Sequence, residues 1–234
     1  MNRKTTKKTV KTILSYLVIA VIGLVLLYPI LWMFFAAFKT NDEIFGSTKL
    51  LATHYSFQNF IDGWRGSGTM TYAVYFWNTF RLVIPVTLLT LVSSTLVAYG
   101  FARFNFPFKK ALFSLLIATL MLPNAVIIIP RYTLFAKFGW IDTYIPFYAL
   151  AALACYPFFI FMLVQFLRGI PRDLDESAYI DGCGTFRTLM QIILPLMKPS
   201  LFSAALFQFM WTYNDYFNSL IFINSGKKYT VSLA

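Results

Sequence analysis

Charged side chains are scarce in this sequence. Only 12% of its 234 residues are Asp, Glu, Lys or Arg, whereas 59% are hydrophobic and 19% aromatic. A soluble domain carries about 25% charged residues. The composition therefore excludes an ordinary soluble protein and predicts an integral membrane protein.

Residues for metal or catalytic chemistry are also few. Cys155 and Cys183 are the two cysteines and His54, expected on an exposed loop, is the one histidine, so no disulfide framework or metal cluster is predicted. No Gly-rich phosphate loop ending in Lys-Ser/Thr occurs, and no nucleophile with a base lies at membrane depth. We therefore expect no enzyme activity, no metal and no cofactor in this chain.

Long charge-free runs make up most of the chain. A bilayer core of about 30 Å needs roughly 20 apolar residues in a helix. Five stretches meet this requirement, and they predict an all-α, polytopic membrane protein forming one domain over residues 1–234. The expected spans are residues 13–38, 76–102, 111–130, 143–167 and 200–223.

The basic residues predict the orientation. The formal net charge is +11, and five basic residues crowd the first eleven positions. Loops rich in Lys and Arg face the cytoplasm, so the N-terminus is expected there. Because successive spans cross the membrane in opposite directions, the 168–199 loop is expected on the inner side. Twelve of the twenty basic residues are then expected on that side. An anionic membrane surface explains this charge better than nucleic acid, which we do not expect as a partner.

The 168–199 loop has the pattern of two short helices joined by a turn. Asp173 and Glu176 can form a capping box, and Gly182 supplies a left-handed residue that ends the first helix. Thr185 can cap the second helix, which Pro195 ends. Helices this short need a supporting surface, although a simple connector between two spans is the alternative reading.

Specific residue types stand at fixed spacing in this loop. They are Glu176, Ser177, Ala178, Gly182, Ile192, Leu194 and Pro195. The arrangement resembles the signature Glu-Ala-Ala-x3-Gly-x9-Ile-x-Leu-Pro of the membrane subunits of ATP-binding-cassette importers, with Ser177 replacing an alanine. Further segments resemble the maltose-transporter-like carbohydrate branch of these permeases. They are 98–104, 122–123, 129–130, 165–166, 170–171, Trp211 and 214–215.

The resemblance implies a mechanism. In that family the loop is a coupling helix that docks on a cytosolic ATPase subunit, a role here expected for the residues listed above and for Asp181. ATP and Mg would be bound by the partner ATPase. A second, related permease and an external sugar-binding protein complete the implied assembly, in a bacterial cytoplasmic membrane. The family usually has six spans, so a sixth helix is expected beyond residue 234.

Polar residues inside the expected spans mark a candidate translocation pathway. Asp215 is the one acidic residue within a span and should avoid lipid. Two fates stay open for it: the pathway, or an intramembrane ion pair with Arg81 at similar depth. Its candidate companions on the pathway are Asn214, Tyr213, Trp211, Asn218 and Asn124.

Several alternatives remain at this point. An importer of a non-sugar solute and, less favoured, a channel share the same composition. The spacing of Ser94, Ala98 and Ala102 predicts a seam of close helix packing. Pro123 and Pro157 predict helix breaks within the membrane, which are tolerated beside a cavity or another helix.

Overall fold

The computed structural model describes residues 3–53, 55–66 and 70–234, so His54 lies outside the described residues. It contains two compact units, residues 1–68 and 69–234. The described residues form helices and no strands, which confirms the all-α fold class. Three helices are long and apolar enough to cross a membrane, and two bent helix pairs raise the number to five.

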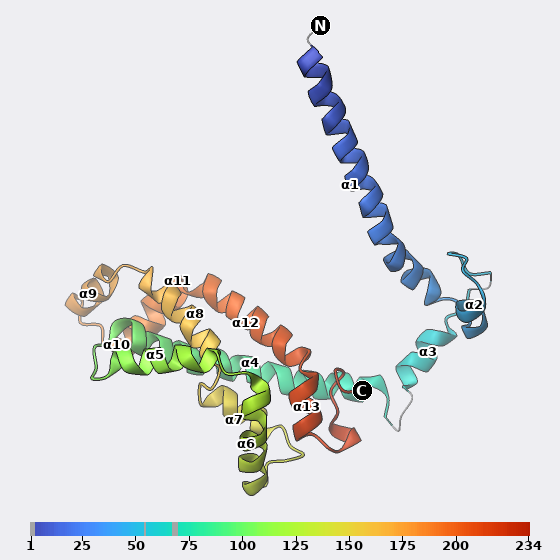
Figure 1. Ribbon diagram of the computed structural model, residues 1–234. Coiled ribbons are helices and arrows are strands. Elements are labelled where there is room, and N and C mark those ends of the chain that lie inside the picture. The colour runs from blue at the N-terminus through green and yellow to red at the C-terminus, as the bar shows by residue number, and fades with distance from the viewer. Residues whose placement is uncertain (1–2, 54, 67–69) are drawn as a thin grey trace. The chain divides into compact units, whose positions relative to one another are not determined.

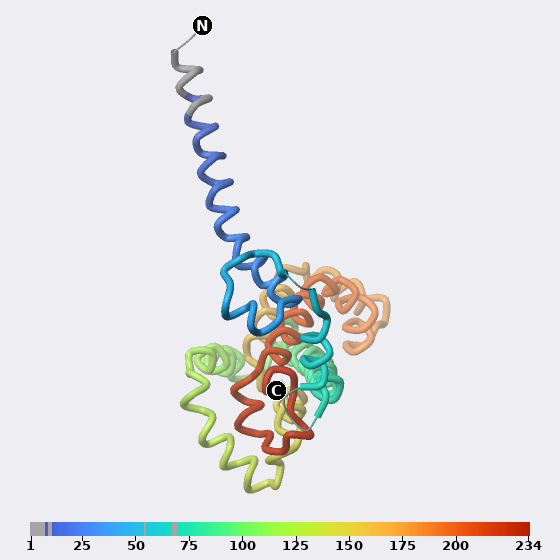
Figure 2. Tube along the Cα trace, turned by 90° about the vertical axis from the view of Figure 1, so that its right-hand side faces the viewer, coloured from blue at the N-terminus to red at the C-terminus, as the bar shows by residue number. Residues whose placement is uncertain are grey.

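The described part of the first unit contains three helices. They are α1 (Arg3–Ala36), α2 (Asn41–Gly46) and α3 (Gln58–Arg65). The apolar stretch of α1 is not covered by the rest of its own unit, and Figure 2 shows it as one continuous helix. The segment that follows α1 is tied to α3, because Asn59 of α3 donates from its amide to the Lys39 carbonyl at 2.6 Å. A helix this apolar and uncovered is suited to contact with lipid or another subunit.

The second unit is built around α4 (Tyr72–Arg103), as Figure 1 shows. The helices α7 (Ile145–Ala152), α8 (Pro157–Arg168) and α12 (Lys198–Tyr213) pack on it. The predicted packing seam is confirmed, since Ser94, Ala98 and Ala102 of α4 are at most 5% exposed. Small side chains let the neighbouring backbones approach closely.

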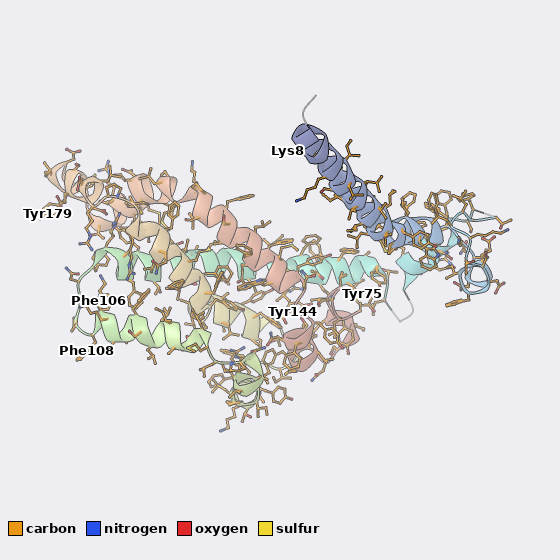
Figure 3. All side chains as sticks on the ribbon, turned by 45° about the horizontal axis from the view of Figure 1, so that its top comes forward. Lys8, Tyr75, Phe106, Phe108, Tyr144 and Tyr179 are labelled. Atoms are coloured by element: carbon orange, nitrogen blue, oxygen red, sulfur yellow. The ribbon has the colours of Figure 1, made fainter. Side chains whose placement is uncertain are left out.

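The remaining helices of this unit lie at its two ends. α5 (Lys109–Leu120) begins at one end and runs back along the bundle (Figure 1). The same end holds α9 (Asp173–Ile180), α10 (Thr185–Thr188), a π-helix (Leu189–Ile193) and α11 (Leu194–Leu196). α6 (Asn124–Lys137), α13 (Tyr216–Phe222) and the 3-10 turn Gly226–Lys228 belong to the other end. Figure 3 labels Tyr179, Phe106 and Phe108 at the first end, and Tyr75 and Tyr144 at the second. We call them the loop end and the tail end.

Prolines break two of the expected spans. The 111–130 span is divided into α5 and α6, which meet at an angle of 103°, with Pro123 at the start of α6. The 143–167 span consists of α7 and α8, with Pro157 at the start of α8. Both breaks were predicted, but the size of the first bend was not.

The expected fifth span, 200–223, is not one helix. α12 begins at Lys198 and ends at Tyr213, and α13 begins at Tyr216. The chain breaks because Asp215 adopts a non-helical backbone and its side chain caps α13 by accepting from the Asn218 N–H. At its other end α12 is bent by 78° relative to the helical segment Thr185–Leu196.

Candidate functional site

The 168–199 loop, which we call the signature loop, is fastened to the end of α4. The Arg103 guanidinium lies 2.9 Å from the Asp175 carboxylate and donates two hydrogen bonds to the Ile170 carbonyl, both 3.2 Å. The Arg172 side chain donates to the Ala102 carbonyl in return. The Arg103 side chain is only 7% exposed, so this ion pair is largely shielded from water. The short helices of this loop are therefore supported by the bundle, which agrees with the expectation that helices of this length need a supporting surface.

The turn between α9 and α10 has the predicted left-handed glycine. Gly182 has φ +78°, and its N–H donates to the Tyr179 carbonyl at 3.0 Å. Ala178 is buried, whereas Tyr179 and Ile180 are 81% and 83% exposed. The loop thus presents two large apolar side chains beside a sharp turn, which is an unusual surface unless a partner covers it.

The other signature residues divide into exposed and packed ones. Glu176, Ser177, Asp181, Gly182 and Pro195 are exposed, and Ile192 and Leu194 are half-buried beneath them. The expected caps are wrong: Arg172 and Gly184 occupy the cap positions, and neither makes a side-chain cap. Asp173 and Thr185 are instead the first residues of their helices. Before Asp173, the backbone of Arg172 already has helical angles. Pro195 does not end the second helix but lies inside α11.

A cavity of about 460 Å³ lies in the second unit. Residues of α5, α6, α7, α8, α12 and α13 line it, together with the chain that breaks between them. Four of the six pathway candidates are brought together there: Asp215, Asn218, Trp211 and Asn124. A volume in this range is typical of small-molecule sites.

Two pathway candidates point elsewhere. Tyr213 stacks on Phe209, with ring centroids 5.9 Å apart, and Asn214 donates to the Met210 carbonyl at 2.8 Å. Neither lines the cavity. Consecutive helical positions face different directions, so a cluster of polar residues along the chain cannot all face one cavity.

Asp215 is held at the cavity wall by its own helix. Its carboxylate accepts hydrogen bonds from the Asn218 backbone N–H and amide, at 2.9 to 3.0 Å. The second of the two open fates, an ion pair with Arg81, is not formed among the described residues, and Arg81 has an exposed side chain. The cap explains this result, since α13 supplies the donors that a partly buried carboxylate needs.

The cavity also contains polar residues that the sequence did not single out. Arg131 and Gln208 line it, and the positive charge of Arg131 acts on Asp215 without forming a direct ion pair. Gln208 is 2% exposed and donates to the Thr212 hydroxyl at 3.0 Å. The sequence placed Arg131 at the start of an outer loop. It reaches the cavity wall because α6 bends by 103° from α5, and the sequence does not show that bend.

A second cluster of polar contacts fastens the C-terminal segment at the tail end. The Asp142 carboxylate accepts from the Ser225 N–H at 2.8 Å and from the Lys228 ammonium at 2.8 Å. Asn78 of α4 donates to the carbonyls of Lys227 and Tyr229. We call these contacts the tail latch, which joins α4, the α6–α7 loop and the chain after α13.

The tail latch predicts a pH effect on stability. Hydrogen bonds from Lys228 and Ser225 hold the pKa of Asp142 well below its ordinary value of 3.8. A depressed pKa stabilises the folded state above the ordinary value and loses that contribution as pH falls. We expect Asp142→Asn to lower stability by about 1 kcal/mol at pH 6, because the pair is partly exposed. Thermal melting in detergent should show this difference shrinking below pH 4.

The matched control is Asp181→Asn, an equally conservative change at an exposed turn. It should leave the melting temperature unchanged at both pH values. A wild-type advantage over Asp142→Asn that persisted undiminished at pH 2.5 would contradict a role for the ionised carboxylate.

Comparison with known proteins identifies the family. Residues 91–233 match the family described as the binding-protein-dependent transport system inner membrane component. The diacetylchitobiose uptake system permease protein NgcG of Streptomyces coelicolor is 28% identical over 87% of this chain and 66% of its own length. The trehalose/maltose transport system permease protein MalG of Thermococcus litoralis is 28% identical over 96% of this chain and 80% of its own.

A solved structure has the same fold. A chain of a bacterial ABC transporter involved in the import of the acidic polysaccharide alginate superposes with a TM-score of 0.81 at 18% identity, covering 97% of this chain and 78% of that one. The family match extends from within α4 through the signature loop and the cavity to the tail latch. The chain therefore belongs to the family of inner-membrane components of binding-protein-dependent transport systems.

Proposed function

We propose that this chain is a transmembrane subunit of an ABC importer and forms half of a translocation pathway for a mono- or oligosaccharide. The observation that carries the proposal is the family match over residues 91–233, which includes the fastened signature loop with its exposed apolar pair. The named substrates of the two relatives, diacetylchitobiose and trehalose or maltose, support a sugar.

The signature loop would receive force from a partner ATPase. Tyr179 and Ile180 supply apolar area for a docking groove, and Glu176 and Asp181 supply charges that fix its register. The Arg103–Asp175 pair would pass the movement to α4. ATP and Mg belong to the partner, and this subunit performs no chemistry itself. The N-terminus and the signature loop lie on the cytoplasmic side in this proposal.

The cavity would form part of the solute pathway. Its wall combines the Trp211 ring with hydrogen-bonding groups of Asn124, Gln208 and Asn218, a combination that suits a sugar with an apolar face and a hydroxyl rim. A second, related permease would close the pathway from the other side, and an external binding protein would deliver the solute. Alternating access would follow from a shift between two arrangements of the helices.

The test is to co-express this chain with the other subunits and to reconstitute the purified complex in liposomes. A panel of sugars, each with the external binding protein, should include one that stimulates ATP turnover and accumulates in the lumen. Co-purification without any ATPase subunit, or solute flux that is independent of ATP, would refute the proposal and favour a channel.

Substitutions of cavity residues test more specifically whether the cavity belongs to the pathway. We expect Arg131→Gln and Asp215→Asn each to lower sugar uptake by roughly tenfold, because each removes a charge that faces the solute. Arg81→Gln is the control, since the exposed Arg81 side chain is absent from the cavity wall. Equal uptake by all three variants would remove the cavity from the pathway.

The same two residues favour one alternative solute class. A cavity with a cation and an anion that do not pair directly also suits a zwitterion. The panel should therefore include a betaine and an amino acid. Stimulation of ATP turnover by these solutes alone would keep the importer assignment and replace the sugar.

A further inference from the structure

Basic residues from three segments meet at the loop end of the bundle. α5 begins at Lys109, α8 ends at Arg168, and Arg172 follows in the connection to α9. Arg103 is neutralised by Asp175. Among the described residues the only other ion pair is Lys228–Asp142 at the tail end, so no carboxylate pairs with these three cations.

The three cations lie close enough to repel one another. Lys109 is partly buried and donates to the Phe104 carbonyl at 2.7 Å, and Arg172 donates to the Ala102 carbonyl, two residues earlier in the chain, at 3.2 Å. The positive charges of Arg172 and Arg168 act against that of Lys109. The Arg168 guanidinium is held 4.9 Å from the centroid of the Phe113 ring on α5. None of the three cations has a direct ion-pair partner among the described residues, so a bound anion would relieve their mutual repulsion.

Apolar surface borders this cluster directly. An open groove of about 450 Å³ is lined by Phe106 and Phe108 together with Lys109, Lys110, Asn105 and Ala111. Figure 3 shows both rings at the loop end. Phe108 is 80% exposed and has φ +60°, a conformation that aromatic residues rarely adopt. Farther along α5, Leu112 and Leu115 are 47% and 63% exposed.

We infer that Lys109, Arg168 and Arg172 bind the phosphate of an anionic phospholipid, whose acyl chains lie along the exposed apolar face of α5. Two features together indicate a lipid. The cations supply charge-assisted donors for phosphate, and the adjoining helix face is apolar along its length, as an acyl chain requires. An acidic protein segment would match the charges but leave that face uncovered.

The experiment uses the purified 234-residue chain in a neutral detergent. Native mass spectrometry with equal amounts of phosphatidylglycerol and phosphatidylcholine should show roughly 30-fold preference for phosphatidylglycerol, the effect of about two cations at a lipid surface. The double variant Lys109→Gln/Arg168→Gln should lose that preference. Arg172 is left in place because it also bonds the Ala102 carbonyl.

The matched control is Arg187→Gln/Lys198→Gln. It removes two exposed cations near the signature loop, outside the cluster, and should keep the preference. An equal loss in both variants would mean general attraction and overturn the site. A wild-type chain that shows no preference for phosphatidylglycerol would also overturn the site. So would a preference that appears only when an acidic protein partner is added.

A second measurement separates the lipid from free phosphate and guards against misfolding. Short-chain phosphatidylglycerol should raise the melting temperature of the wild type, while inorganic phosphate at the same concentration should not. Equal shifts would assign the cations to a soluble anion and refute the lipid. If the double variant does not fold, Arg168→Gln alone should lower the shift, whereas Arg168→Lys, which keeps the charge, should retain most of it.

Discussion

Gly182→Trp is expected to reduce ATP-driven uptake by roughly tenfold or more in the reconstituted complex. The turn requires φ +78° at this residue, and the glycine is exposed beside Tyr179 and Ile180. An indole there would strain the turn and stand between the loop and the ATPase groove. Uptake, together with recovery of the ATPase subunit on affinity purification, is the measurement.

Two alanine variants separate strain from docking. No atom lies within 4 Å of a Cβ added at Gly182 or at Gly184, so neither alanine clashes within the chain. Gly184 has an ordinary φ of −72° and should tolerate alanine. Gly182→Ala should cost about 1 kcal/mol of local stability and leave most of the uptake. Unchanged uptake in Gly182→Trp would rule out the docking role of this turn.

Arg103→Met is expected to have the largest effect on stability. It leaves the Asp175 carboxylate without its cation and the Ile170 carbonyl without its donor, both at the base of the signature loop. Breaking one side of a largely buried ion pair costs about 3 kcal/mol. The melting temperature should fall, and hydrogen exchange should rise throughout α9.

A second substitution makes this prediction specific. Arg103→Met/Asp175→Leu removes both charges and should recover part of the lost stability, because no unpaired charge remains. Arg187→Met is the control: Arg187 is exposed and bonds only Gln191 among the described residues, so the change should cost less than about 0.5 kcal/mol. If Arg103→Met melted like this control, the pair would not hold the loop.

The sequence predicted those features that local patterns determine. Charge-free runs predicted the membrane helices, small residues every four positions predicted the α4 seam, and Pro123 and Pro157 predicted the breaks. Gly182 was predicted because a turn between two short helices requires a left-handed residue. Each of these follows from the preferences of neighbouring residues in the chain.

Long-range contacts could not be predicted in the same way. Lys228 meets Asp142 across 86 positions, and nothing in either segment indicates the other. Arg131 reaches the cavity because α5 and α6 meet at 103°, an angle that packing determines. Arg81 and Asp215 were predicted to lie at similar depth, but the donors that α13 gives to Asp215 depend on where the chain breaks, which depth does not show.

One helix carries both fastening points. Asn78 of the tail latch and Arg103 at the signature loop belong to α4, and 25 residues of helix separate them by about 37 Å. Such a rod acts as a lever arm: a tilt of about 10° around one end carries the other through roughly 6 Å. In the proposed importer, a small displacement at the signature loop would thereby become a larger one at the tail end of α4.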